Sequence, residues 1–140
     1  MNTTSSTVRK IVLIGSNPNI NSALEQLLPS DYTLINYLTD GLDELWQDSE
    51  FSEHVSSAVA VMLELSNYER GGLEFLSEFK RRFPSKPVVV FHDYIEKSYA
   101  REILKRGAMA YLPVNTFSEE LDEALLTILA NCIYVSGQVY

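Results

Sequence analysis

The chain has 140 residues, which is enough for one compact domain but not for two. Hydrophobic residues make up 46% of the chain and charged residues 21%, a balance that excludes disordered and fibrous proteins. Nineteen acidic against eleven basic residues give a formal net charge of -8, so we expect the domain itself to bind neither nucleic acid nor an anionic membrane surface.

Cysteine and histidine are too scarce for several kinds of site. One cysteine cannot form an internal disulfide, and two histidines leave almost no material for a zinc site, so we expect no cofactor. Apolar runs such as 58–63 are far shorter than the roughly 20 residues that span a bilayer. The first residues also lack an apolar signal core, and a cytoplasmic location fits best.

The first third of the chain predicts two strands and two helices. After a polar tail, the apolar run 10–15 is typical of a strand buried on both faces. Asn17, followed by proline, has the pattern of an N-cap, and the helix that it opens is expected to end at Pro29. Residues 32–38 predict a second strand, and apolar residues within 42–46 predict a short helix.

The middle of the chain predicts two further strands around a helix. Residues 47–57 have the composition of a polar connection, and the wholly apolar run 58–63 predicts a buried strand. Apolar residues recur at helical spacing over 71–83, where two glycines open the segment and prolines close it. A fourth strand follows over 87–91.

The last third predicts two helices around a short strand. A helix with one apolar face runs from Ile95 to Leu104 and stops at Gly107, where we expect a left-handed cap. The next strand is 110–112, and residues 116–119 resemble a capping box for the last helix.

Five strands that alternate with five helices predict a doubly wound α/β fold with a five-stranded parallel sheet. We expect one domain over residues 10–131, with a flexible tail over 1–9 and a C-terminal tail or the start of a linker over 132–140. Ligands and chemistry in such folds sit at the carboxyl ends of the strands, so the residues that follow each strand decide function.

Several motifs have the spacing of a known family. Leu63-Glu64-Leu65-Ser66, followed by Gly72-Leu73-Glu74-Phe75-Leu76, resembles the phosphoacceptor strand and the next helix in receiver domains of two-component response regulators. Like residues also stand at Asp40-Gly41, at Pro87-Val88-Val89-Val90, and at Gly107-Ala108 with Tyr111-Leu112. The resemblance covers roughly 10–134 and implies the flavodoxin-like receiver fold. Residues 128–136 resemble the receiver-to-linker junction of LuxR-type regulators, in which a helix-turn-helix domain comes next.

The same resemblance implies that the phosphorylation pocket is degenerate. The family's two Mg²⁺-binding acids correspond to Gly15 and Ser16, neither of which has an anionic oxygen. The phosphoacceptor aspartate corresponds to Glu64, the hydroxyl residue to His92 and the lysine to Val114. Phosphoryl transfer depends on a metal, a cation and an oriented acceptor. We therefore expect a pseudo-receiver that is not an enzyme and does not accept phosphate.

Other interpretations of these positions stay open. Glu64 either imitates the phosphorylated state, with His92 as its partner, or is simply a polar residue at a strand end. Ser16, His92 and Glu64 could also form a hydrolytic relay, although no Gly-x-Ser-x-Gly elbow is present, so a small serine hydrolase is the least favoured function. Tyr111 matches the family's switch aromatic, and we expect a static, half-buried ring.

We expect the domain to act by protein contact and homodimerisation, as the regulatory module of a LuxR-type transcription regulator. A stand-alone adaptor that docks on a kinase or another partner is the alternative. Besides four inward residues, the last helix carries apolar Ala124, Leu126 and Ala130, although Leu126 could instead lie under the C-terminal tail. The candidate dimer or partner surface comprises Tyr99, Arg101, Lys105, Tyr111, Asp122 and Leu126.

Overall fold

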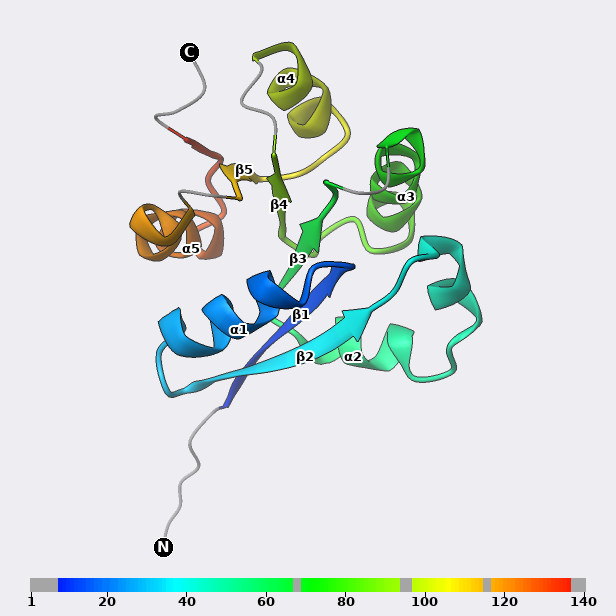
Figure 1. The fold of residues 1–140 in the computed structure, drawn as a ribbon, viewed down its shortest axis with the longest axis horizontal. Coiled ribbons are helices and arrows are strands. Elements are labelled where there is room, and N and C mark those ends of the chain that lie inside the picture. Colours follow the sequence, from blue (N-terminus) through cyan, green and yellow to red (C-terminus); the bar gives the residue numbers. More distant parts are fainter. Residues whose placement is uncertain (1–7, 67–68, 94–96, 115–116, 137–140) are drawn as a thin grey trace, which may run out of the picture.

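One parallel sheet forms the centre of the computed structural model, which describes residues 8–66, 69–93, 97–114 and 117–136 (Figure 1). Among these residues the sheet has six strands in the order β2-β1-β3-β4-β5-β6, and every neighbouring pair is parallel. The strands are β1 (Arg9–Gly15), β2 (Tyr32–Leu38), β3 (Ala60–Glu64), β4 (Val88–His92), β5 (Ala110–Pro113) and β6 (Tyr134–Val135). This doubly wound order confirms the predicted α/β class.

Helices cover both faces of the sheet. The α-helices are α1 (Pro18–Leu27), α2 (Phe51–Ser57), α3 (Glu69–Arg82), α4 (Lys97–Lys105) and α5 (Leu121–Leu129), and the 3₁₀ helices are η1 (Leu42–Gln47) and η2 (Phe117–Glu119). Buried residues of α1, η2 and α5 form one core cluster, and those of η1, α2, α3 and α4 form the other. Figure 1 shows α1 and α5 together on one side of the strands, with α3 and α4 on the other.

The inner strands of the sheet bury side chains on both of its faces, whereas the edge strand β2 has only half-buried and exposed residues. Successive side chains of a strand point to opposite faces of the sheet. In β1, Val12 and Ile14 belong to the cluster under α2, α3 and α4, whereas Ile11 and Leu13 belong to the cluster under α1 and α5. Because both faces are covered by helices, every one of these positions is buried.

Two predicted helix caps are confirmed. The Asn17 side chain accepts a hydrogen bond from the Asn19 N–H at 2.9 Å, which caps α1. Gly107, which follows α4, has a φ of 110°. A Cβ at Gly107 would also lie 2.9 Å from Cγ of Lys80, so both the backbone conformation and the space favour glycine there.

Helix α2 was not predicted, since 47–57 was interpreted as a polar connection. That prediction is wrong for Phe51–Ser57. Phe51 and Val55 are four residues apart, 2% and 0% exposed, and they anchor the helix on the sheet. Two apolar residues at this spacing were the available signal, and the surrounding polar residues obscured it.

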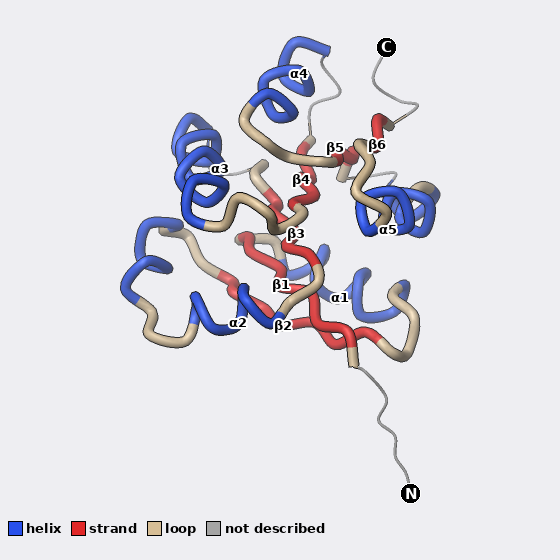
Figure 2. Tube along the Cα trace, turned by 180° about the vertical axis from the view of Figure 1, so that it is seen from behind, coloured by secondary structure: helices blue, strands red, loops and turns tan. Residues whose placement is uncertain are grey.

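The sixth strand corrects the predicted count of five strands. Tyr134 and Val135 pair with Ala110 and Tyr111 of β5, so part of the predicted C-terminal tail belongs to the sheet (Figure 2). The chain turns back after α5 at Asn131, a non-glycine residue with a φ of 65°. Five helices is also too few, because five α-helices and two 3₁₀ helices occur among the described residues.

The Glu120 carboxylate holds this C-terminal segment in place. Its two oxygens accept hydrogen bonds from the Tyr134 and Ser136 hydroxyls, each at 2.6 Å. The Ser136 side chain is fully buried. A carboxylate that bonds two hydroxyls from one segment fixes the path of that segment against the start of α5.

Other boundaries differ by a few residues. β3 and β4 each begin and end slightly later than predicted, and α3 begins at Glu69, before its glycines. The predicted start of the fourth helix at Ile95 and the capping residue Thr116 lie outside the described residues. Helix α5 begins at Leu121, later than predicted, and its N-cap residue Glu120 forms no side-chain cap hydrogen bond. Of the predicted tail 1–9, Arg9 already belongs to β1, and residues 1–7 lie outside the described part.

No helix in the described part of the chain is long and apolar enough to cross a membrane.

Candidate functional site

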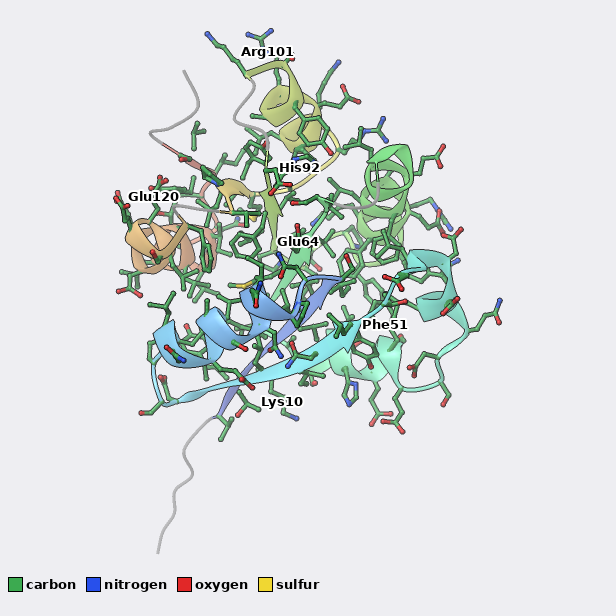
Figure 3. All side chains as sticks on the ribbon, viewed as in Figure 1. Lys10, Phe51, Glu64, His92, Arg101 and Glu120 are labelled. Atoms are coloured by element: carbon green, nitrogen blue, oxygen red, sulfur yellow. The ribbon has the colours of Figure 1, made fainter. Side chains whose placement is uncertain are left out.

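The predicted pocket residues meet at the carboxyl edge of the sheet. Ile14 and Leu63 are paired across β1 and β3, so the residues that follow them, Gly15 and Glu64, lie side by side. His92 at the end of β4 pairs with Pro113 of β5, and the His92 carbonyl accepts a hydrogen bond from the Val114 N–H at 3.0 Å. Figure 3 shows Glu64 and His92 at the ends of their strands, between α1 and α4.

The carboxyl group of Glu64 is buried against β1. The residue is 1% exposed, and Oε2 accepts a hydrogen bond from the Ser66 N–H at 2.9 Å, whereas Oε1 has no hydrogen-bond partner. A Cβ at Gly15 would lie 2.9 Å from Cβ of Glu64 and 3.6 Å from its Oε1. The Glu64 side chain therefore occupies the space that a side chain at position 15 would need.

A small cavity adjoins the Glu64 carboxyl group. It has a volume of about 10 Å³ and is lined by residues of β1, α1 and β2, including Gly15, Asn17 and Asn21. The Asn21 Oδ1 is, like Glu64 Oε1, buried without a hydrogen-bond partner. A space of this size holds at most one group the size of a water molecule, so it cannot hold a phosphoryl group.

These residues do not fit the magnesium ion that a phosphorylation site of this kind would need. Mg²⁺ takes oxygen ligands in near-ideal octahedral geometry, usually with one or two carboxylates. Neither Gly15 nor Ser16 has a carboxylate, and one oxygen of Glu64 is already bonded to the Ser66 N–H. In the described part of the chain, no three His, Cys, Asp or Glu side chains are grouped to hold a metal.

His92 is buried beside an aromatic ring rather than bonded to Glu64. It is 3% exposed, and its ring centroid lies 4.5 Å from that of Tyr99. Among the described residues, the Glu64 carboxyl group bonds to the Ser66 N–H and forms no direct hydrogen bond with His92. The hydrolytic relay of Ser16, His92 and Glu64 is not assembled either, since its acid would have to orient the histidine.

Burial also affects the titration of His92. It lowers the pKa of His92 because the charged imidazolium is disfavoured away from water, and the nearby Asp93 carboxylate partly offsets this effect.

We expect the His92 NMR titration midpoint to lie below 6.5, and to fall further in Asp93→Asn, which removes the charge that raises the pKa. Because the pKa of His92 is lower in the folded protein, the unfolded chain binds a proton at a higher pH than the folded protein does. The folded state therefore loses stability as the pH falls below about 6.5, the ordinary pKa of histidine. Glu64→Gln is the matched control and should move the midpoint less. A midpoint above 6.5, or a larger shift in Glu64→Gln, contradicts the placement of these groups.

Tyr111 is more deeply buried than expected. It is 1% exposed rather than half-buried, and its ring centroid lies 6.0 Å from that of Tyr99. Tyr99 thus lies between the rings of Tyr111 and His92. This row of aromatic rings connects the end of β4 with β5 beneath α4.

Only some residues of the candidate partner surface are exposed to solvent. Arg101 and Lys105 on α4 and Asp122 and Leu126 on α5 are exposed, as Figure 3 shows for Arg101. The side chain of Tyr99 is half-buried and that of Tyr111 is buried, so Tyr111 is not part of this surface. Ala124 is also buried, at 1% exposure, and not outward as expected.

Comparison with known proteins gives a structural match but no sequence match. No protein-family model matches the sequence, and no curated protein matches it either. A two-component response regulator of the LuxR family from Aurantimonas sp. SI85-9A1 superposes with a TM-score of 0.78 over 95% of this chain and 93% of that chain, at 18% identity. The chain has the receiver fold.

Two structures of the Salmonella regulator RcsB have the same receiver fold. One, from Salmonella typhimurium, matches with a TM-score of 0.75 at 16% identity and covers 94% of this chain and 64% of that chain. The other is the isolated REC domain from Salmonella enterica serovar Typhimurium with the phosphomimetic BeF3-, with a TM-score of 0.74, 15% identity, and coverage of 94% and 95%. At these identities the likeness establishes the receiver fold.

The sequence analysis missed one polar residue that matters to this receiver fold. Glu120 bonds both hydroxyls of the segment that forms β6, yet it was not singled out. Its partners Tyr134 and Ser136 lie 14 and 16 residues further along the chain, so no local pattern links them to Glu120.

Proposed function

We propose that this domain is a phosphorylation-independent receiver that transmits signals through protein contacts, chiefly self-association, as the regulatory module of a LuxR-type transcription regulator. The observation that carries the proposal is the packing of Glu64 over Gly15. The side chain at the phosphoacceptor position takes the space of the missing metal-binding acid, so the pocket is filled rather than merely altered.

The chemistry of the remaining positions supports the same conclusion. Val114 is a half-buried apolar residue where the family has a lysine, and Ser16 has no negative charge. Phosphoryl transfer relies on positioned charges to offset the charge that develops in the transition state. Without a metal-binding acid or this lysine, the domain lacks the positioned charges that phosphoryl transfer needs.

The exposed apolar side chains near the C-terminal edge of the sheet support self-association. Leu126 on α5 is 72% exposed, Val135 on β6 is 49% exposed, and Ile133, which directly precedes β6, is 59% exposed. Ile133 and Tyr134 therefore do not fold back over Leu126, contrary to the alternative considered above. Asp122 lies one helical turn before Leu126, so a two-fold contact can pair it with a basic residue such as Arg101 of a second copy.

Leu126→Glu is expected to weaken the dimer at least about tenfold, because a charge would be buried at the centre of an apolar contact. The monomer should keep its stability, since this side chain already faces solvent. Light scattering over a dilution series, together with thermal unfolding, measures both effects.

Leu38→Glu is the matched control. Leu38 is 61% exposed and lies on β2, the opposite edge strand of the sheet, so this variant should associate like the parent. A parent protein that stays monomeric up to several hundred micromolar would refute self-association. Equal weakening by the two variants would refute the proposed surface.

A further inference from the structure

A second surface, on the other face of the sheet from α5, is a groove between η1 and α3. Its volume is about 590 Å³, within the usual range for sites that bind ligands. Its lining includes the side chains of Trp46 and Phe75 and five acidic residues. In Figure 1 the segment that follows β2 lies beside α3, and residues of both line the groove.

The aromatic part of the lining is held rigidly. The Trp46 ring stacks on the buried Phe75 ring, with centroids 4.9 Å apart and an interplanar angle of 24°. The Arg82 guanidinium covers Trp46 as well, 4.2 Å from the ring centroid. Contacts with Phe75 and Arg82 therefore hold the Trp46 ring in its place in the groove lining.

The acidic part of the lining has an excess of negative charge. Glu78 is neutralised by ion pairs with Arg81 and Arg82, which lower the pKa of Glu78 to about 2. The other acidic lining residues form no ion pair with a described side chain; they are Asp40, Asp43, Glu44 and Glu74. Like charges gathered around one groove repel each other, so a cation placed there is stabilised by all four.

The groove is also open where α3 begins. Gly71 lines it, and a Cβ added at this glycine would meet nothing within 4 Å. A side chain at position 71 would therefore extend into the groove without displacing any of its walls.

We propose that this groove docks a basic segment of a partner protein, with arginine or lysine side chains between the four carboxylates and apolar side chains against Trp46 and Leu42. Charge complementarity identifies the occupant: the groove is acidic, and the chain as a whole carries a formal charge of -8. The same charge excludes anionic partners such as nucleic acid. This surface lies across the sheet from Leu126, so it does not depend on the proposed self-association.

A fluorescein-labelled peptide of four arginines alternating with four leucines is a suitable probe, with its glutamate counterpart as the negative control. Anisotropy should show binding of the basic peptide alone, weakened by added salt. Trp46 is the single tryptophan of the chain, so its emission should change when unlabelled peptide fills the groove.

Variants separate the groove from general attraction to an acidic protein. Asp43→Asn with Glu74→Gln should raise the dissociation constant about tenfold, equivalent to about 1.4 kcal/mol, and Gly71→Arg should block binding while Gly71→Ala does not. The charge-matched control is Glu25→Gln with Asp31→Asn, two exposed acids outside the groove, and should change binding less than twofold. Equal effects of the two double variants, or binding without any change in Trp46 emission, would overturn the proposal.

Discussion

Phe75→Ala is expected to lower the free energy of unfolding by about 3 to 5 kcal/mol, the usual cost of removing a buried aromatic side chain. Phe75 is 2% exposed, stacks on Trp46, and lies 6.2 Å from the ring of Phe79. Its loss leaves a cavity between α3 and η1, so the attachment of η1 should loosen. Urea denaturation should show a lower midpoint with an unchanged slope.

Phe83→Ala is the control for this prediction. Phe83 also contacts Phe79, with centroids 5.0 Å apart, but it is only half-buried, so its removal should cost less than half as much. Equal losses of stability for the two variants would contradict the burial of Phe75 between α3 and η1.

Gly15→Ala is expected to lower the free energy of unfolding by about 1 to 3 kcal/mol through overpacking. The added Cβ would lie 2.9 Å from Cβ of Glu64, and both atoms are fixed by the backbone of paired strands. Either strand β1 or strand β3 must therefore shift. Thermal and urea unfolding of the variant measure the cost.

The same substitution at another glycine is the matched control. A Cβ at Gly71 meets nothing within 4 Å, so Gly71→Ala in α3 should raise stability by about 0.5 to 1 kcal/mol, as alanine is the better helix former. A lower free energy of unfolding for Gly15→Ala together with a higher one for Gly71→Ala would support the packing of Glu64 over Gly15. A neutral or stabilising Gly15→Ala would contradict it.

Much of the fold could be predicted because the inner strands of its sheet are buried on both faces. Residues 11–15 of β1 and 88–91 of β4 form unbroken apolar runs, and Asn17 and Gly107 mark helix ends by local chemistry. The missed elements depend on distant contacts instead. The buried residues of helix α2 are Phe51 and Val55, and β6 forms because the chain turns back at Asn131 after α5 and Glu120 bonds the returning segment.

The candidate site was predicted only in part, because its residues are marked by sequence motifs whereas the directions of their side chains depend on packing. The resemblance placed Gly15, Glu64 and His92 at one edge of the sheet, and they lie there. The direction of the Glu64 side chain could not be predicted, because it depends on the space above Gly15 and not on any sequence motif. The acidic groove could not be predicted either, since Asp43 and Glu74 are brought together by the packing of Trp46 on Phe75.

The central claim is that the domain works without phosphoryl transfer, and intact-mass spectrometry after incubation with acetyl phosphate and Mg²⁺ tests it most directly. A receiver domain that retains the metal-binding acids and the acceptor aspartate, treated in parallel, controls for the activity of the phosphodonor. The account predicts an unchanged mass for this chain, because Glu64 is buried over Gly15 and no carboxylate stands at Gly15 or Ser16. A stoichiometric gain of one phosphoryl group that is lost in Glu64→Ala would contradict it.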